Sequence, residues 1–217
     1  MVSEILEFLS GDTPLRGVLS QGQTRLDKGA LILHPHPLYG GDMHNPVVTA
    51  LEHVLLDAGY TTLRFDFRGT STSPQGYSGI DSAIIDASNA MKLLLSRGVR
   101  ECGVAGYSFG GSTAIRSAIG PLPLFLITLS ASFGLIAEGN FDTTQLTRIT
   151  CPTLMFHGLA DRMVPHADIE TLSKFIGSQE LETVSIEEEG HFYNRSIEIV
   201  KNRTRRFLGK INTIDRT

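Results

Sequence analysis

The chain has 217 residues, of which 41% are hydrophobic and 19% are charged, and these values predict one globular domain over residues 1–217 with a sizeable core. The net charge of −4 argues against nucleic acid as the main partner. The longest apolar run, residues 122–129, is too short to cross a bilayer, so no membrane partner is expected.

The first half of the chain alternates between strand and helix patterns. Two apolar strands separated by residues 11–14 predict an opening hairpin. Asn45 and Pro46 suit a helix N-cap and a first helical position, and Gly59 ends that helix. The expected elements are strands at 5–10, 15–21, 29–34 and 60–67, and helices at 45–59 and 79–97.

The second half keeps this rhythm and then ends in a predicted flexible tail, residues 212–217. Its expected elements are strands at 103–107, 124–130, 153–156 and 181–186, and helices at 111–119, 142–146, 167–176 and 196–208. Strands that alternate with helices predict an α/β fold, a mostly parallel sheet with helices on both faces. Ligands of such sheets bind outside the carboxyl ends of the strands.

The cysteines and the N-terminus indicate a location. Cys102 and Cys151 each begin an apolar strand-like run, and two cysteines do not make a disulfide framework. Glu4 and Glu7 interrupt the early apolar run, so no secretory signal is expected. A reducing cytoplasm is the expected location.

Residues 106–110 read Gly-Tyr-Ser-Phe-Gly, the Gly-x-Ser-x-Gly pattern of a nucleophile elbow. A serine on a tight strand-to-helix turn leaves no room for side chains two residues away on either side. The turn also places the first free amides of the helix beside the oxygen of Ser108. The pattern alone also fits a glycine-rich turn that merely packs, so its surroundings must decide.

A serine nucleophile needs a base, and the base needs an orienting carboxylate. In an elbow fold the chain order is serine, acid, histidine. Of the histidines after Ser108, His157 precedes the best acid candidate and His166 opens a helix and is expected to face solvent. His191 lies in the loop after the last strand, from which it can reach Ser108. We therefore predict His191 as the base in preference to the other two.

Asp161 is the predicted acid, because it follows the strand 153–156 and lies one strand before His191. Asp142, in the loop after the preceding strand, is the alternative. Asp161 also fits a simple turn or cap before Val164 and Pro165.

The oxyanion of the reaction needs backbone donors. One is the amide of Phe109, the residue after the nucleophile. The loop after the strand 29–34 should supply the second, and its two prolines have no N–H. That leaves the amide of His36 or, failing that, the amide of Leu38 or Tyr39.

The spacing of His34 and His36 also raises a metal pair, with Asp42 and His44 as further ligands. The loop is proline-rich and no second ligand cluster accompanies it. We therefore expect no metal and no cofactor, and imidazoles that line or brace the pocket floor.

Together these segments resemble the α/β-hydrolase superfamily over nearly the whole chain. The stretch 36–41 is similar to small bacterial predicted hydrolases close to the dienelactone-hydrolase branch. The resemblance implies an eight-stranded sheet with one antiparallel strand and a triad of Ser108, Asp161 and His191. The matching segments are the His34 loop, residues 65–69, the elbow, residues 152–158 with Asp161, and Gly190-His191.

Two departures from the family pattern stand out. Ser71 occupies a position where the superfamily usually has glycine, which puts the conformation of that loop in doubt, and Arg68 before it is expected to form a structural ion pair. A dienelactone hydrolase proper uses a cysteine nucleophile, so Ser108 argues against that specific activity.

Only residues 131–150 separate the strand after the elbow helix from the next strand, too few for a helical cap domain. We expect an open, shallow pocket for small ester-like substrates, with Tyr39, Tyr107 and Phe133 as candidate substrate-binding residues. Phe133 also fits the edge of the core. The run Glu187–Glu189 is expected to be a solvated turn, although it could also disfavour anionic substrates.

The sequence thus predicts a serine hydrolase of small carboxylic esters or thioesters. A small serine peptidase or amidase would use the same parts. A catalytically idle hydrolase fold that serves as an interaction module is the rival from another class, and the complete triad order argues against it. The substrate and the oligomeric state stay open, because function depends on the site and not on the fold.

Overall fold

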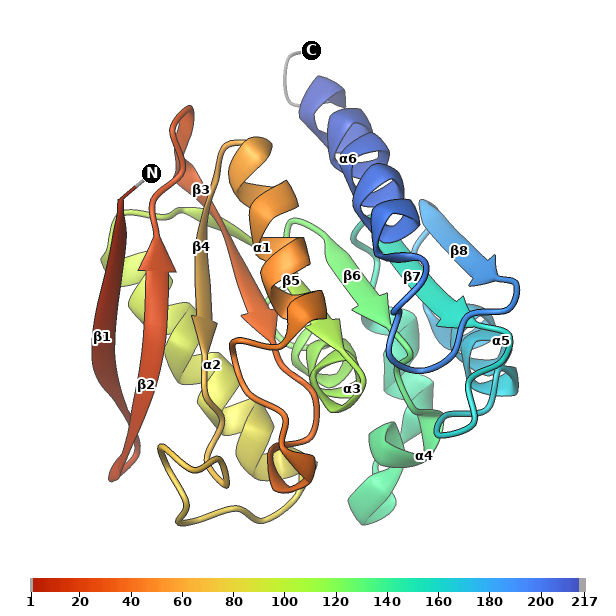
Figure 1. The fold of residues 1–217 in the computed structure, drawn as a ribbon, viewed down its shortest axis with the longest axis horizontal. Coiled ribbons are helices and arrows are strands. Elements are labelled where there is room, and N and C mark those ends of the chain that lie inside the picture. The colour runs from red at the N-terminus through yellow and green to blue at the C-terminus, as the bar shows by residue number, and fades with distance from the viewer. Residues whose placement is uncertain (1, 215–217) are drawn as a thin grey trace.

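The computed structural model describes residues 2–214, which form one eight-stranded sheet in the order β1-β2-β4-β3-β5-β6-β7-β8 (Figure 1). Only β2 runs antiparallel to its neighbours, and the other pairs are parallel. This confirms the predicted eight-stranded sheet with one antiparallel strand. The strands are β1 Ser3–Ser10, β2 Thr13–Ser20, β3 Arg25–Leu33, β4 Tyr60–Phe65, β5 Glu101–Tyr107, β6 Leu126–Leu129, β7 Thr153–Gly158 and β8 Leu181–Ile186.

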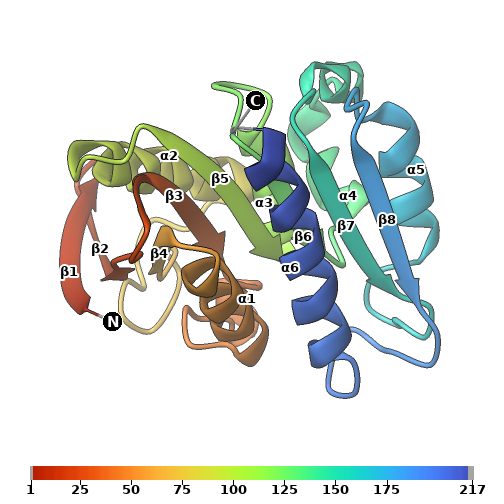
Figure 2. The same ribbon diagram turned by 90° about the horizontal axis from the view of Figure 1, so that it is seen from above.

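Helices cover both faces of the sheet (Figure 2). On one face, α1 and α6 pack against each other and over one apolar cluster. On the other face, α2 and α3 share a second cluster with α4 and α5. The α-helices are α1 Pro46–Asp57, α2 Ile80–Ser96, α3 Phe109–Ser117, α4 Phe133–Ile136, α5 Ala167–Phe175 and α6 Ile197–Ile214. Among residues 2–214, none of these helices is both long and apolar enough to cross a membrane.

The local signals at α1 act as predicted. The side chain of Asn45 accepts a hydrogen bond from the amide of Val47, and Pro46 occupies the first turn. Gly59 follows the helix with φ of 94°, a conformation that suits glycine. The chain can therefore turn directly into β4.

Two helices differ from their predicted bounds. Helix α3 begins and ends two residues earlier than predicted, because Ser108, with φ of 55°, makes the whole turn between strand and helix. Helix α6 continues to Ile214, since Ile211 is buried and Asn212 accepts a hydrogen bond from the Tyr60 hydroxyl at 2.9 Å. Residues 212–214 are thus helical, whereas the predicted helix ended at residue 208. The predicted flexible tail, residues 212–217, lies partly outside the described residues and stays a prediction.

The segment between β6 and β7 has no cap domain. It holds the single-turn helix α4 and two short 3₁₀ helices, Glu138–Asn140 and Thr143–Arg148. The sequence predicts the last of these as a short helix at 142–146 but misses α4. The side chain of Ser132 caps α4 by accepting from the amide of Leu135.

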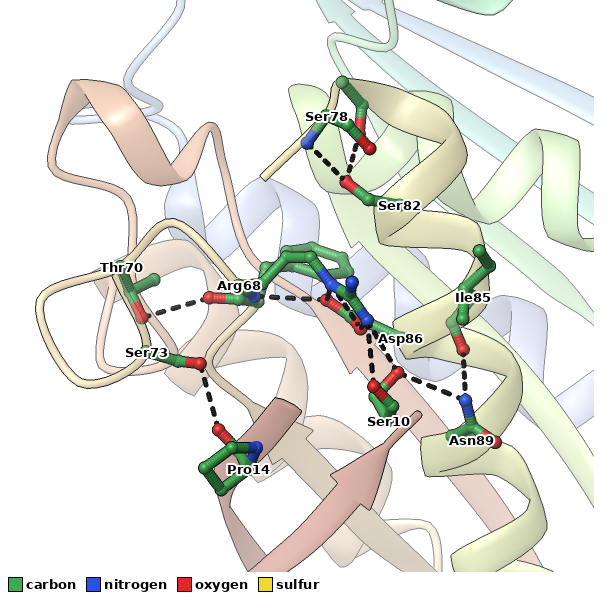
Figure 3. Close-up of polar contacts among 12 residues, drawn as sticks. Ser10, Pro14, Arg68, Thr70, Ser73, Ser78, Ser82, Ile85, Asp86 and Asn89 are labelled. Carbon is green, nitrogen blue, oxygen red and sulfur yellow. Dashed lines mark hydrogen bonds and ion pairs between the residues drawn. The ribbon is translucent and has the colours of Figure 1, made fainter. Parts of the chain in front are cut away.

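Arg68 forms the predicted structural ion pair (Figure 3). Its Nη2 lies 2.7 Å from Oδ1 of Asp86, a carboxylate with no exposed surface. The same Nη2 donates to the carbonyl and the hydroxyl of Ser10. The side-chain amide of Asn89 also donates to that hydroxyl. The pair therefore joins the β1–β2 hairpin to α2.

The loop after Arg68 is closed by hydroxyl groups in place of a second glycine. The hydroxyl of Thr70 donates to the carbonyl of Phe67, and that of Thr72 donates to Asp66. Ser73 donates to the carbonyl of Pro14 (Figure 3). Ser71 itself is exposed, so its side chain meets no steric obstacle there.

We predict that Asp86→Ala lowers the free energy of unfolding by about 3 kcal/mol, because the mutation leaves the guanidinium of Arg68 buried without its partner. Urea unfolding followed by circular dichroism measures the change. Asp81→Ala is the matched control: Asp81 lies on the same helix and pairs with Arg116, but its side chain is 66% exposed. That control should cost less than about 1 kcal/mol, and equal losses in the two variants would contradict the prediction.

Candidate active site

Ser108 lies at the carboxyl end of β5, where the strand turns sharply into α3. Its backbone adopts φ of 55° and ψ of −118°, a conformation that L-residues rarely take. A Cβ at Gly106 would lie 2.2 Å from the carbonyl oxygen of Gly110, and a Cβ at Gly110 would lie 2.2 Å from that of Leu33. Both glycines of the motif are therefore required by close backbone contacts.

His191 and Asp161 reach Ser108 from the loops after β8 and β7. His191 Nε2 lies 2.9 Å from Ser108 Oγ, and His191 Nδ1 lies 2.7 Å from Asp161 Oδ2. A carboxylate beside Nδ1 keeps the proton on that nitrogen, so Nε2 can accept the hydroxyl proton of Ser108. The structure thus brings together the three side chains that the sequence selects.

The loop that carries His191 is fixed by two buried groups. The hydroxyl of Tyr107 donates to the carbonyl of His191 at 2.8 Å. The carboxylate of Glu189 accepts from the amides of Gly190 and Arg195 at 2.9 and 3.0 Å. Glu189 is 4% exposed, so the prediction of a solvated turn is wrong for this residue. Its side chain turns inward to satisfy the amides of the loop.

The carboxylate of Asp161 is held from several sides. Its Oδ1 accepts from the amides of Met163 and Val164, both at 2.9 Å. Burial opposes ionisation, but the hydrogen bond from His191 and those two amides outweigh it and lower the pKa of Asp161 to about 2. The group is therefore ionised at neutral pH and serves as an acceptor for His191.

Ser130 and Tyr193 support Asp161, and no sequence pattern predicted either residue. The Ser130 hydroxyl donates to Asp161 Oδ2 at 2.8 Å and lies 3.0 Å from the hydroxyl of the buried Tyr193. Both residues have positive φ, 45° and 55°. Neither is glycine, so the strain of these backbones is held in place by the packing around them. Ser130 directly follows β6. Its place at the carboxyl end of a parallel strand is the one sequence feature that could have indicated a role in the site.

The alternative bases and the alternative acid have other partners. His157 is buried, its Nε2 donates to the carbonyl of Val164 at 3.0 Å, and burial lowers its pKa. His166 lies 2.8 Å from the hydroxyl of Ser185. Asp142 caps a 3₁₀ helix by accepting from the amide and the hydroxyl of Thr144. Hydrogen bonds of the described residues connect none of the three to Ser108.

The loop after β3, residues 34–41, is called the oxyanion loop here, and its backbone amides differ in their hydrogen-bond acceptors. Leu38 donates to His36 Nδ1 at 3.2 Å, and Tyr39 donates to the carbonyl of His36 at 3.1 Å. Among the hydrogen bonds of the described residues, the amides of His36 and Phe109 have no protein acceptor. The rings of His36 and Phe109 pack with centroids 4.7 Å apart. Of the candidate amides, those of His36 and Phe109 therefore remain to serve a substrate oxygen.

The nitrogens of the histidine pair are engaged by protein groups. His34 is buried, its Nε2 accepts from the amide of Phe67 at 2.8 Å, and burial lowers its pKa to about 4. His36 Nε2 donates to the hydroxyl of Tyr77 at 2.9 Å, because its Nδ1 is occupied as an acceptor. Within residues 2–214, no three His, Cys, Asp or Glu side chains are grouped to hold a metal ion. The pair braces the loop.

A cavity of about 590 Å³ opens above Ser108. Tyr39 and Tyr107 line it, as predicted, but Phe133 does not. The ring of Phe133 stacks on Phe175 of α5 at 5.9 Å, and Leu135 lines the wall in its place. An aromatic residue in this segment could serve either purpose, and the position of α5 decides it. The sequence analysis also misses the lining residues Asn45, Ser132, Glu138, Met163 and Phe192.

Residues 28–206 match the sequence model of the Dienelactone hydrolase family. The chain belongs to this family. It is therefore a hydrolase by family, with the α/β-hydrolase fold.

Three individual proteins illustrate what this chain is similar to. An uncharacterized protein of Rickettsia prowazekii is 30% identical over 154 residues, which are 70% of this chain and 64% of that relative. An α/β serine hydrolase homologue from Coxiella burnetii is 25% identical, with a TM-score of 0.83 over 95% of this chain and 97% of that one. A serine hydrolase without lid from Xanthomonas campestris shares the fold, with 24% identity and a TM-score of 0.80 over 96% and 94% of the two chains.

For this dienelactone hydrolase family member, we predict that Ser130→Ala lowers kcat about 10-fold with little change in KM. The mutation removes the charge-assisted hydrogen bond from Ser130 to Asp161, the carboxylate that accepts from His191. KM should change little because Ser130 does not line the cavity. Tyr193→Phe should have a smaller effect. The double variant should be no slower than Ser130→Ala, because Tyr193 acts through Ser130. Steady-state kinetics of the three variants test this order, and additive losses would contradict it.

We also predict that Asp161 makes stability depend on pH below about pH 4. An unfolded carboxyl binds its proton near pH 4, whereas folded Asp161 stays ionised to about pH 2. The unfolded state thus binds more protons between these values, and stability is lost as the pH falls. Between pH 6 and pH 3 the wild type should lose about 1 kcal/mol more than Asp161→Asn. Urea unfolding at both pH values measures this, and equal losses would contradict it.

Proposed function

We propose that the protein is a serine hydrolase that cleaves small carboxylic esters or thioesters through an acyl-enzyme on Ser108. The observation that carries this proposal is the unbroken line of contacts from Ser108 Oγ to His191 at 2.9 Å and on to Asp161 at 2.7 Å. Family membership makes the chain a hydrolase, and this geometry supports the finer assignment.

In the first half of the reaction, Ser108 Oγ attacks the ester carbonyl carbon while its proton passes to His191 Nε2. The carbonyl oxygen becomes negative, and the amides of His36 and Phe109 are placed to donate to it. Asp161, ionised and buried, stabilises the imidazolium. The leaving alcohol or thiol then takes the proton from Nε2, and the acyl group remains on Ser108.

In the second half, water replaces the alcohol. His191 Nε2 takes a proton from the water as the water oxygen attacks the acyl carbon. The same two amides hold the second oxyanion. When this intermediate collapses, the C–O bond to Ser108 breaks, the serine recovers its proton from Nε2, and a carboxylic acid leaves.

The open cavity favours small substrates. Residues 131–150 form α4 and two short 3₁₀ helices beside the site and do not cover it. Apolar side chains stand at the mouth, with Tyr39 83%, Met163 61% and Phe192 60% exposed. Such a rim can bind a short acyl chain or a flexible alcohol, without the enclosed volume that a long lipid would need.

A fluorophosphonate probe tests the proposal in one step. We expect the probe to label the wild type on the peptide that contains Ser108, and Ser108→Ala to lose both the label and about 10³-fold or more of p-nitrophenyl acetate turnover. Ser117→Ala is the matched control, since Ser117 lies at the far end of the same helix.

Labelling or turnover that persists in purified Ser108→Ala would move the nucleophile elsewhere. A wild type that takes no label would support the idle-fold alternative. A panel of acyl and peptide substrates then separates an esterase from a peptidase or amidase.

A further inference from the structure

The charged side chains that line the cavity above Ser108 are negative. Among the described residues, the lining contains one carboxylate side chain, Glu138, and neither lysine nor arginine. The remaining polar lining groups are neutral amides and hydroxyls together with the two imidazoles of His36 and His191. A substrate bound there meets a negative charge with no cation in the lining to compensate it.

Glu138 is available to a ligand. It is exposed, and among the described residues it makes no hydrogen bond and no ion pair. Arg116, on the neighbouring helix α3, is already taken: its Nη2 lies 2.9 Å from Asp81, and its guanidinium stacks on Phe141 at 4.5 Å. Glu138 therefore lines the cavity with no ion-pair partner among the described residues, and its Oε2 lies close to Gly79 at the start of α2.

The field of Glu138 reaches the oxyanion loop. Burial lowers the pKa of His36, and Glu138 partly opposes this change. Burial raises the pKa of Tyr77, and Glu138 adds to that rise. Tyr77 is the hydrogen-bond partner of His36, whose amide is one of the proposed oxyanion donors. Glu138 is thus electrostatically close to the place where the substrate would react.

Aromatic faces stand at the same cavity. Tyr39 and Phe192 line it from opposite loops and are 83% and 60% exposed. Exposed rings beside a carboxylate attract organic cations, because a positive charge over a ring face adds to the attraction of the carboxylate. Neither residue is needed to build the core.

We propose that the substrate of this site carries a positive charge, an ammonium group within a few bonds of the scissile ester, and that Glu138 with the rings of Tyr39 and Phe192 binds that group. This rests on the proposed ester hydrolysis at Ser108. Glu138 acts here on specificity and not on the bond-breaking step. A substrate with a carboxylate in the same place would be repelled.

The test uses two esters of nearly the same shape. Acetylcholine and 3,3-dimethylbutyl acetate differ in that a quaternary nitrogen replaces a carbon, so the ratio of their kcat/KM values reports charge alone. We expect the wild type to favour acetylcholine about 3- to 10-fold at low salt, as one partly screened charge allows, with the preference shrinking as salt is added. Glu138→Gln should lower the ratio toward one, with the attraction of the two rings remaining, and Glu138→Lys should lower it further.

Glu7→Gln is the matched control. It makes the same change of residue and of net charge on β1, where Glu7 is exposed and outside the cavity lining, so it should keep the wild-type ratio. A wild-type ratio at or below one, or a ratio that Glu138→Gln leaves unchanged, overturns the charge proposal. Failure of p-nitrophenyl acetate turnover and of fluorophosphonate labelling is a different result: it overturns the proposed ester hydrolysis, and this inference with it.

Discussion

The site depends on the hydrogen bonds that the carboxylate of Asp161 accepts. This carboxylate accepts four hydrogen bonds, from the side chains of His191 and Ser130 and from the amides of Met163 and Val164. A buried carboxylate without such donors would take up a proton and lose its hold on the imidazole. These four donors come from three different loops. The position of the Asp161 carboxylate therefore depends on how the loops at the carboxyl ends of the strands pack together. The proposed chemistry at Ser108 follows from that position, since an alcohol needs a firmly oriented base.

The sheet explains how distant segments meet at this point. The order β3-β5-β6-β7-β8 places the oxyanion loop, the elbow, Ser130, Asp161 and His191 at the carboxyl ends of five adjacent parallel strands. Parallel strands need crossover helices, and those helices cover both faces, which leaves the loops at the strand ends as the accessible surface. The antiparallel β1–β2 hairpin lies at the far edge and contributes stability, through Arg68 and Asp86, and no group to the site.

Much of this was predictable because it rests on short-range rules. The glycines around Ser108 follow from a turn that brings Gly106 against Gly110, and Asn45 with Pro46 fixes the start of α1. Ser130 and Tyr193 were not predictable, since their contacts join residues far apart along the chain and both backbones have a positive φ. Glu189 accepts from the nearby amides of Gly190 and Arg195, but a run of three glutamates gives no sign of which carboxylate turns inward. The prediction that Phe133 lines the pocket was wrong for the same reason. Its ring could line the pocket or pack at the edge of the core, and it packs against Phe175, which the fold brings close. The end of α6 was predicted too early for a similar reason, since Ile211 is buried and Asn212 accepts a hydrogen bond from the distant Tyr60.

The strained residues show how such a site is maintained. Ser108, Ser130 and Tyr193 all adopt positive φ without being glycine. All three belong to the hydrogen-bonded chain that runs from Ser108 through His191 and Asp161 to Tyr193. Each such backbone costs of order 1 kcal/mol or more and persists only where its surroundings over-determine it. Here the surroundings are the hydrogen bonds themselves: Ser130 is held by Asp161 and Tyr193, and Asp161 by His191. The hydrogen bonds thus offset the cost of the strained backbones, so removing a single hydroxyl from this network would leave that strain less well compensated. A cysteine nucleophile, partly ionised near neutral pH, needs less help from its base. The serine nucleophile proposed for this family member would depend more strongly on an ordered acid.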